Sequence, residues 1–121
     1  MAVISPTILA HGTGYLLLEW GAMANTDTGA PVSFPDYEYK SFHCTGTPGT
    51  TGVATIQASN DFGGTLEYFT AHDPASNDLV LSDDEGRQMI ETSYHVRPSI
   101  GSGDGTTSLT VTMLAMTSAR R

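Results

Sequence analysis

The 121-residue chain contains one cysteine and one lysine, and it has no apolar run long enough to span a membrane. The single Cys44 excludes an internal disulfide, so the fold must be stable without covalent cross-links. We interpret Cys44 as a small buried apolar residue and not as a reactive thiol. The N-terminus lacks a basic start, and Pro6 interrupts its apolar stretch, so we expect no signal peptide.

Basic residues are also scarce. Five Lys and Arg face thirteen Asp and Glu, which gives a net charge of -8, and two of the five bases are the terminal Arg120 and Arg121. Binding to nucleic acid or to an anionic membrane requires clustered Lys and Arg, because these side chains contact the phosphate groups. The composition therefore predicts that neither is a partner.

No catalytic or metal-binding motif is visible. The four histidines are His11, His43, His72 and His95. None has the spacing of a metal-ligand pair. His72 precedes Asp73, but a His-Asp pair at a turn is usually structural. The acidic run 83–85 does not match a calcium-binding loop and is better interpreted as a solvated turn. We therefore predict no cofactor, no bound metal and no enzymatic activity.

Gly, Ser and Thr are abundant, with 41 residues in all. Threonine favours strands and glycine favours turns, and the length suits one domain. Alternating apolar and polar residues predict short strands at 15–20, 37–44, 53–59, 65–71, 79–81, 94–98 and 108–116, with a further strand possible at 3–9. We expect Pro98 to mark an edge or an end of its strand. Residues 83–92 fit either one helical turn or a strand and a turn.

Eight or nine short strands separated by turns predict an all-β fold, an antiparallel β-sandwich that we expect to be jelly-roll-like. Residues 1–35 carry few charges and alternate poorly, so we assign them to an N-terminal arm and first strand. Residues 36–121 are assigned to the sandwich. An arm that packs on a neighbouring molecule and an ordinary first strand of the same sheet are both open interpretations.

Six segments match, in order, motifs of one family. They are 25–31 (NTDTGAP), 34–37 (FPDY), 53–61 (VATIQASND), 72–77 (HDPASN), 94–99 (YHVRPS) and 103–112 (GDGTTSLTVT). Together they resemble small structural proteins encoded by tailed bacteriophages, and the strand-turn at 53–61 is also similar to the galactose-binding-like jelly-roll of discoidin domains. One departure is Phe62-Gly63-Gly64, since the usual turn carries a tryptophan shortly after its Asp-Gly pair.

The resemblance implies a virion protein, with capsid decoration as the favoured role. The implied partners are the major capsid protein and further copies of the chain, with a trimer favoured. The protein would then be found on the capsid surface, and in the host cytoplasm during assembly. The alternatives are a glycan-binding protein of the virion surface and a component of the tail or of the head-tail connector.

Candidate contact residues follow from exposed apolar stretches and from loops. The predicted partner-binding residues are Val3, Ile4, Ile8, Leu9, Thr47, Pro48, Thr50, Asp104 and Thr106. Under the glycan-binding alternative, the predicted stacking residues are Phe62, Tyr68 and Phe69, because aromatic rings offer flat apolar area to a sugar. Trp20, Tyr37, Tyr39 and Tyr94 are further aromatic residues, most of which we expect in the core.

Overall fold

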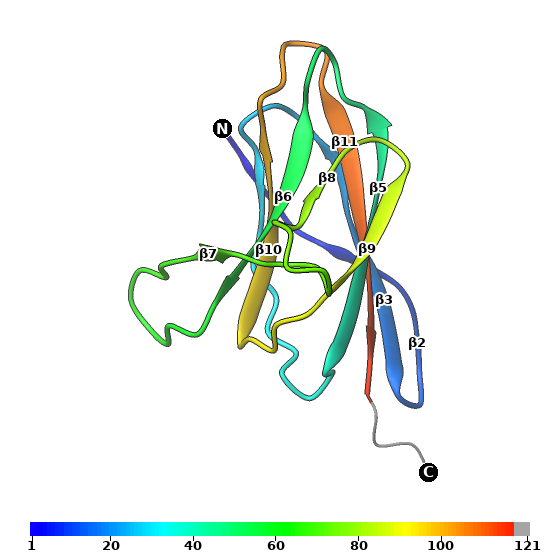
Figure 1. Ribbon diagram of the computed structural model, residues 1–121, viewed down its shortest axis with the longest axis vertical. Coiled ribbons are helices and arrows are strands. Elements are labelled where there is room, and N and C mark those ends of the chain that lie inside the picture. The colour runs from blue at the N-terminus through cyan, green and yellow to red at the C-terminus, as the bar shows by residue number, and fades with distance from the viewer. Residues whose placement is uncertain (118–121) are drawn as a thin grey trace.

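The computed structural model describes residues 1–117. In this part of the chain, eleven strands form two sheets that pack face to face, and no helix is present (Figure 1). The prediction of an all-β sandwich is therefore confirmed. No helix among these residues is long and apolar enough to cross a membrane. Arg120 and Arg121 lie outside the described residues.

The first sheet, sheet A, has six strands. Their bounds, in order across the sheet, are β1 (Val3–Ile4), β4 (Thr28–Gly29), β10 (His95–Gly101), β6 (Val53–Ser59) and β7 (Phe69–Thr70), with β8 (Val80–Leu81) also paired to β6. β1 and β4 run parallel, and the other pairs are antiparallel.

The second sheet, sheet B, has five strands, all paired antiparallel. In order across the sheet they are β2 (Thr7–Gly12), β3 (Tyr15–Met23), β11 (Ser108–Met116), β5 (Tyr39–Thr47) and β9 (Glu85–Met89). The three central strands, β3, β11 and β5, are nine residues long each. The outer edges are β2 and β9.

The core between the sheets follows from period-two alternation, because successive side chains of a strand point to opposite faces. Every second residue of β6, β10 and β11 is buried, as is every second residue of β5 up to Cys44. Largest among the fully buried side chains are Trp20, Phe42, Leu18, Met23 and Ile56. The predicted strands at 53–59 and 108–116 are confirmed with these bounds as β6 and β11.

The predicted strand at 65–71 is wrong in extent, since only Phe69–Thr70 pairs as β7. The preceding residues form a loop in which Gly63 and Gly64 both have positive φ angles, 83° and 65°. The carboxylate of Asp61 accepts a hydrogen bond from the backbone N–H of Glu67 at 2.7 Å and closes this loop. The alternation at 65–68 therefore reflects loop residues and not a paired strand.

The expectation for Pro98 is also wrong, because it lies buried within β10, between β4 and β6. The N–H groups of Val96 and Ile100 donate toward the β4 side, to the carbonyls of Val32 and Asp27. Pro98 nitrogen points the same way by alternation, toward a strand of only two residues. Because β4 is so short, no continuous ladder of hydrogen bonds runs along this side of β10. The backbone N–H that proline lacks is therefore not needed there.

Gly29 of β4 lies beside this proline, where the space is too narrow for a side chain. A Cβ atom at Gly29 would lie 2.6 Å from Cδ of Pro98 and 2.6 Å from Cδ1 of Trp20. The indole Nε1 of Trp20 donates a hydrogen bond to the carbonyl of Ala30 at 3.0 Å, which fixes the ring against β4. Sheet A can therefore pack closely on Trp20 only because Gly29 has no side chain.

The N-terminal residues and the segment 83–92 adopt strand structure. Residues 1–35 contribute β1 to β4, and the chain passes from the edge of sheet A to the edge of sheet B between β1 and β2. Of the two interpretations of residues 83–92, strand and turn is confirmed by β9, which pairs with β5. The helical turn is wrong, because Arg87 and its neighbours pair along β5 and form no helical turn.

Two polar groups are buried on the inner side of β5. The thiol of Cys44 is fully buried, and burial, with the nearby charges of Asp83 and Glu85, raises its pKa to about 11. Lys40 is 3% exposed and its ammonium donates to the carbonyl of Tyr37 at 2.7 Å. Burial lowers the pKa of Lys40. Cys44 therefore behaves as a small apolar core residue, as its isolation in the sequence predicted.

Candidate functional site

The outward face of sheet B carries large apolar side chains at one end. Leu114 of β11 lies opposite Leu17 of β3, and Met116 lies opposite both Tyr15 and Tyr39. Tyr15, Met116 and Tyr39 are 38%, 40% and 50% exposed. These five residues define the apolar face. A solvated sheet face normally carries polar residues, so a cluster of this kind marks a contact surface.

The apolar face is hollowed. Two depressions of about 460 and 220 Å³ adjoin along β11, β5 and β9, and both are lined by Ser41, Gln88 and Leu114. Small side chains explain the depth, because Ser41 stands between the larger Leu114 and Gln88 in the ladder. The face therefore offers a concave apolar surface and not a flat one.

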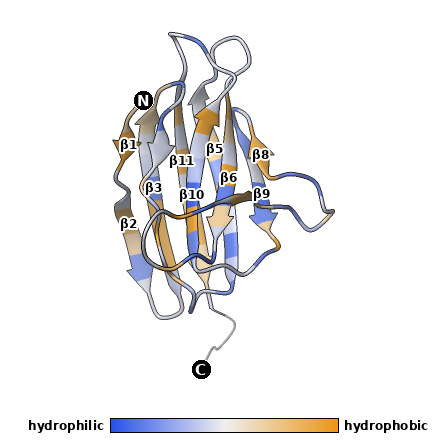
Figure 2. Ribbon diagram, turned by 90° about the vertical axis from the view of Figure 1, so that its left-hand side faces the viewer, coloured by the Kyte–Doolittle hydropathy of each residue, from blue (hydrophilic) through white to orange (hydrophobic). Residues whose placement is uncertain are grey.

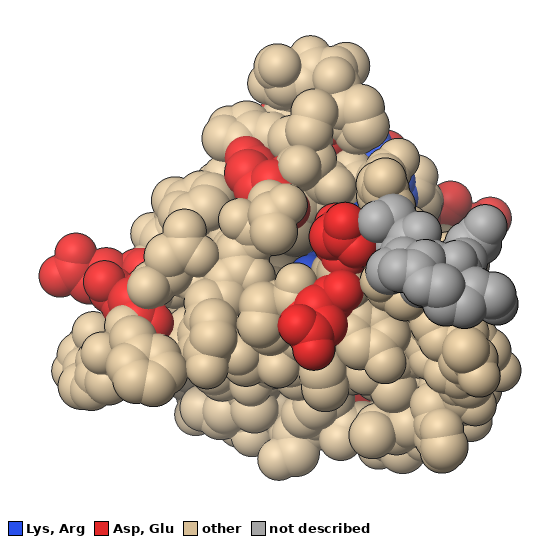
Figure 3. Space-filling view, turned by 90° about the horizontal axis from the view of Figure 1, so that it is seen from below, with Lys and Arg blue, Asp and Glu red and all other residues tan. Residues whose placement is uncertain are grey.

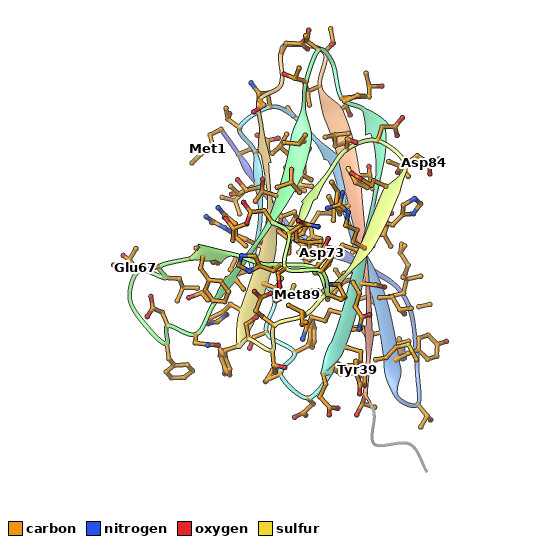
Figure 4. The ribbon with its side chains drawn as sticks, viewed as in Figure 1. Met1, Tyr39, Glu67, Asp73, Asp84 and Met89 are labelled. Carbon is orange, nitrogen blue, oxygen red and sulfur yellow. The ribbon has the colours of Figure 1, made fainter. Side chains whose placement is uncertain are left out.

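Charges lie at the rim of the hollow. Arg87 pairs with Glu85 at 2.7 Å and with Asp73 at 3.5 Å, and His43 lies 3.3 Å from Asp84. Figure 4 places Asp84 at the turn before β9, beyond the centre of the face. Among the described residues, no carboxylate lines either depression, whereas Arg87, His43 and the buried Lys40 border them. Glu19 stands on the same outward face, opposite Thr112. In the end view of Figure 3, by contrast, most of the charged atoms in sight are acidic.

The predicted contacts of the N-terminal segment lie along one edge of the sandwich. Val3, Ile8 and Leu9 are 62%, 56% and 49% exposed, whereas Ile4 packs against the core. Figure 2 shows apolar colouring along β1 and β2 at this edge. The β2–β3 register shifts between Ile8 and Ala10, so Leu9 is the extra residue of a bulge. Partner binding by these residues stays a prediction.

The predicted loop contacts come together at one end of the sandwich. They are Thr47, Pro48, Thr50, Asp104 and Thr106. Asp104 accepts hydrogen bonds from the backbone N–H and the hydroxyl of Thr50, at 2.9 and 2.7 Å. Thr106 donates in the same two ways to the other carboxylate oxygen. These bonds, those from Thr106 first, hold the pKa of Asp104 far below its usual range. The two loops therefore form one braced unit.

Of the predicted stacking residues, Tyr68 lies at the outer side of sheet A against Arg97, Phe62 lies on the loop after β6, and Phe69 pairs with the inward-facing Ala58. Phe62 is 81% exposed, and its ring contacts Tyr94 edge-on with centroids 5.5 Å apart. The guanidinium of Arg97 lies 3.8 Å from the centre of the Tyr68 ring. Phe69, on β7, is 42% exposed. Trp20 is fully buried. The expectation that most of the aromatic residues lie in the core is wrong, because Tyr39 and Tyr94 are 50% and 37% exposed and Tyr37 is only partly buried.

His72 is the most strongly tied of the four histidines. Its ring Nδ1 hydrogen-bonds the carboxylate of Glu91, and its Nε2 lies 3.4 Å from Asp78. The hydrogen bond to Glu91, with the charges of Glu91, Asp78 and Asp73, raises the pKa of His72. No group of three His, Cys, Asp or Glu side chains among the described residues is placed to hold a metal ion. The arrangement joins the segment before β8 to the segment after β9.

This arrangement predicts a pH-dependent stabilisation. Because the pKa of His72 is raised on folding, its contribution is fully present below the unfolded value of about 6.5 and is lost as the pH rises through the folded value. His72→Gln should therefore lower Tm by a few degrees at pH 6 and by much less at pH 9, measured by thermal unfolding in matched buffers. An equal loss at both pH values would contradict a titrating interaction.

Sequence reasoning missed the apolar face. The sequence did indicate such a face, because residues 15–18 are apolar on both sides of the strand. Leu16 and Leu18 point into the core, and Leu17 points outward. Leu114 and Met116 repeat this pattern on β11. Only the pairing of β3 with β11, far apart in sequence, places these side chains in one patch. The role of Arg97 beside Tyr68 was missed for the same reason.

Fold and surface together define a small β-sandwich domain that carries a concave apolar contact face. No protein-family model matches the chain, and no curated protein matches it. A solved structure with a similar fold is that of SPBc2 prophage-derived protein YomS, with a TM-score of 0.60 and 13% sequence identity. The match covers 89% of this chain and 99% of that chain. The two proteins therefore share the sandwich along nearly their whole lengths.

Proposed function

We propose that the chain is a structural protein of a tailed-phage particle, with capsid decoration as its role. The observation that carries the proposal is the hollowed apolar face of sheet B, whose centre is formed by Leu17 and Leu114. The shared fold with a prophage-derived protein and the ordered sequence motifs supply the phage setting. We propose no catalytic role and no cofactor.

The size of sheet B supports a stable protein contact. Five strands spaced about 4.8 Å apart, with central strands of nine residues at about 3.3 Å each, give a face of roughly 24 by 30 Å, or about 700 Å². A specific interface buries about 800 Å² on each partner. The occupant we propose is a subunit of the major capsid protein, since a hollow with no carboxylate among its described lining residues limits repulsion between the acidic chain and its partner.

The mechanism is thermodynamic. A protein that binds only the assembled shell adds its binding free energy to the assembled state and shifts the equilibrium toward it. Several copies on one symmetric shell, each touching two capsomers, would gain further through multivalency. We propose that the copies associate as a homo-oligomer, a trimer in the favoured form, through the apolar edge that carries Ile8 and Leu9.

The test uses particles assembled from a genome that lacks the gene for this chain. Purified protein should bind these particles saturably, as measured by sedimentation and gel densitometry. It should also raise, by several degrees, the temperature at which the packaged genome becomes accessible to dye. Absence of saturable binding at micromolar protein would overturn the proposal. Antibody labelling at the tail or the neck, and not on the head, would replace decoration with a tail or connector role.

A further inference from the structure

We propose that the outer face of sheet A binds a neutral, pyranose-based polysaccharide along an aromatic strip. We define the aromatic strip by the side chains of Phe62, Tyr94, His95, Tyr68 and Arg97. It lies on the opposite side of the sandwich from the apolar face of sheet B. The inference goes beyond the particle role proposed above and does not depend on it.

Two rings at one end of the strip provide a stacking platform. Phe62 is 81% exposed and stands on the protruding loop that also carries Glu67 (Figure 4). Its ring meets Tyr94 at an interplanar angle of 73°, and Tyr94 in turn meets His95 edge-on at 4.7 Å. Exposed rings with fixed neighbours offer flat apolar area to the C–H face of a sugar at little cost in conformational entropy.

The loop that carries this platform is braced. The side-chain carbonyl of Asn60 accepts a hydrogen bond from the backbone N–H of Tyr94 at 2.8 Å, and the hydroxyl of Ser59 accepts one from the N–H of Asp61 at 3.0 Å. The loop is therefore tied both to itself and to the start of β10. Phe62 stays 81% exposed on this braced loop, with Tyr94 touching its ring on one side.

At the other end, the strip provides hydrogen-bonding groups. The guanidinium of Arg97 lies over the Tyr68 ring, with Cζ 3.8 Å from its centre, and its Nε donates to the side-chain carbonyl of Gln57 at 2.9 Å. No described carboxylate forms an ion pair with Arg97, although the chain is strongly acidic. The terminal amino groups of Arg97 are thus available to vicinal hydroxyls, which a fixed guanidinium recognises in pairs.

The surroundings of the strip favour a polysaccharide over a protein partner. Thr55, Gln57 and Ser99 continue the outward face of β6 and β10 beside Arg97. These small polar side chains suit a hydroxylated ligand, whereas sheet B presents Leu17 and Leu114 in the corresponding place. Sheet A therefore combines rings with polar donors, and sheet B does not.

The negative charges near the aromatic strip favour a neutral ligand over an anionic one. Asp61 and Glu67 lie on the same loop as Phe62, and both are exposed. A polyanion would meet these carboxylates and the net charge of -8 with only Arg97 to attract it. A neutral hexose polymer meets no such repulsion.

Affinity gel electrophoresis of the isolated protein tests the inference. The probes are dextran, yeast mannan and galactomannan as neutral polysaccharides, and heparin as a polyanion. We expect retardation by at least one neutral polysaccharide, with Kd raised about tenfold by Phe62→Ala and by Arg97→Met. Because both side chains project outward from sheet A, the variants should keep the Tm of the wild type.

Ile90→Ala is the matched control, since Ile90 is an exposed apolar residue just after β9 of the other sheet and belongs to neither proposed contact surface. It should leave retardation unchanged. Absence of retardation in all three neutral gels, or retardation that Phe62→Ala and Arg97→Met do not weaken, would overturn the site. Loss of particle binding in Phe62→Ala would instead assign the strip to a protein contact. Retardation by heparin alone would overturn the choice of a neutral ligand.

Discussion

Leu114→Glu should weaken binding to the particle by at least about 100-fold, because it buries an unpaired carboxylate at the centre of the apolar face. The substituted side chain points away from the core, between Leu17 and Ser41, so the sandwich should stay folded. Binding is measured by sedimentation with particles that lack the protein, and folding by Tm.

Ser108→Glu provides a control with the same charge on the same strand. Ser108 lies at the other end of β11, on the same outward face, and is exposed. It should change affinity by less than about threefold, as expected for a charge outside the hollow. If Leu114→Glu binds as tightly as the wild type while the wild type binds well, the particle role stands and the assignment of the apolar face fails.

Gly29→Ala should be the most destabilising conservative substitution in sheet A. The added methyl would lie 2.6 Å from both Pro98 and Trp20, and neither ring is free to move, since one is part of the backbone and the other is hydrogen-bonded to Ala30. Overpacking of this kind costs about 1–3 kcal/mol. For a domain of this size, Tm should fall by roughly 10 °C.

Gly101→Ala is the matched control for this substitution. Gly101 ends β10, and a Cβ atom there would meet no other atom within 4 Å. Its free energy of unfolding should change by less than about 0.5 kcal/mol. Equal losses from the two variants, measured by denaturant unfolding, would show that Gly29 is not distinguished by its contacts.

Strands with one buried face were predictable from the sequence. Residues 53–59 and 108–116 alternate without interruption, and β6 and β11 have these bounds. The alternation is a direct consequence of packing one face on the core. The prediction from alternation was wrong at 65–71. There, a hydrogen bond to Asp61 and two glycines with positive φ form a loop, although its residues alternate in polarity as those of a strand do.

The candidate sites were less predictable, because they are made by pairing across long stretches of chain. Phe62 was recognised as a stacking candidate from its type alone, but its contact with Tyr94 depends on β10 lying beside β6. The position of Pro98 depends likewise on how short β4 is. Local patterns carry no information about such neighbours, so the sequence could not place them.

The pairing of β3 with β11 also has a consequence for biosynthesis. Leu17 and Leu114 meet only when nearly the whole chain has emerged and a loop of this length has closed, which is entropically costly and slow. In a truncated chain that lacks β11, β3 could pair only with β2 and β5 only with β9, so sheet B would be split in two. Under the proposed role, subunits whose synthesis is incomplete would lack the complete apolar face and could not compete for sites on the shell, so the late closure would act as a quality check on assembly.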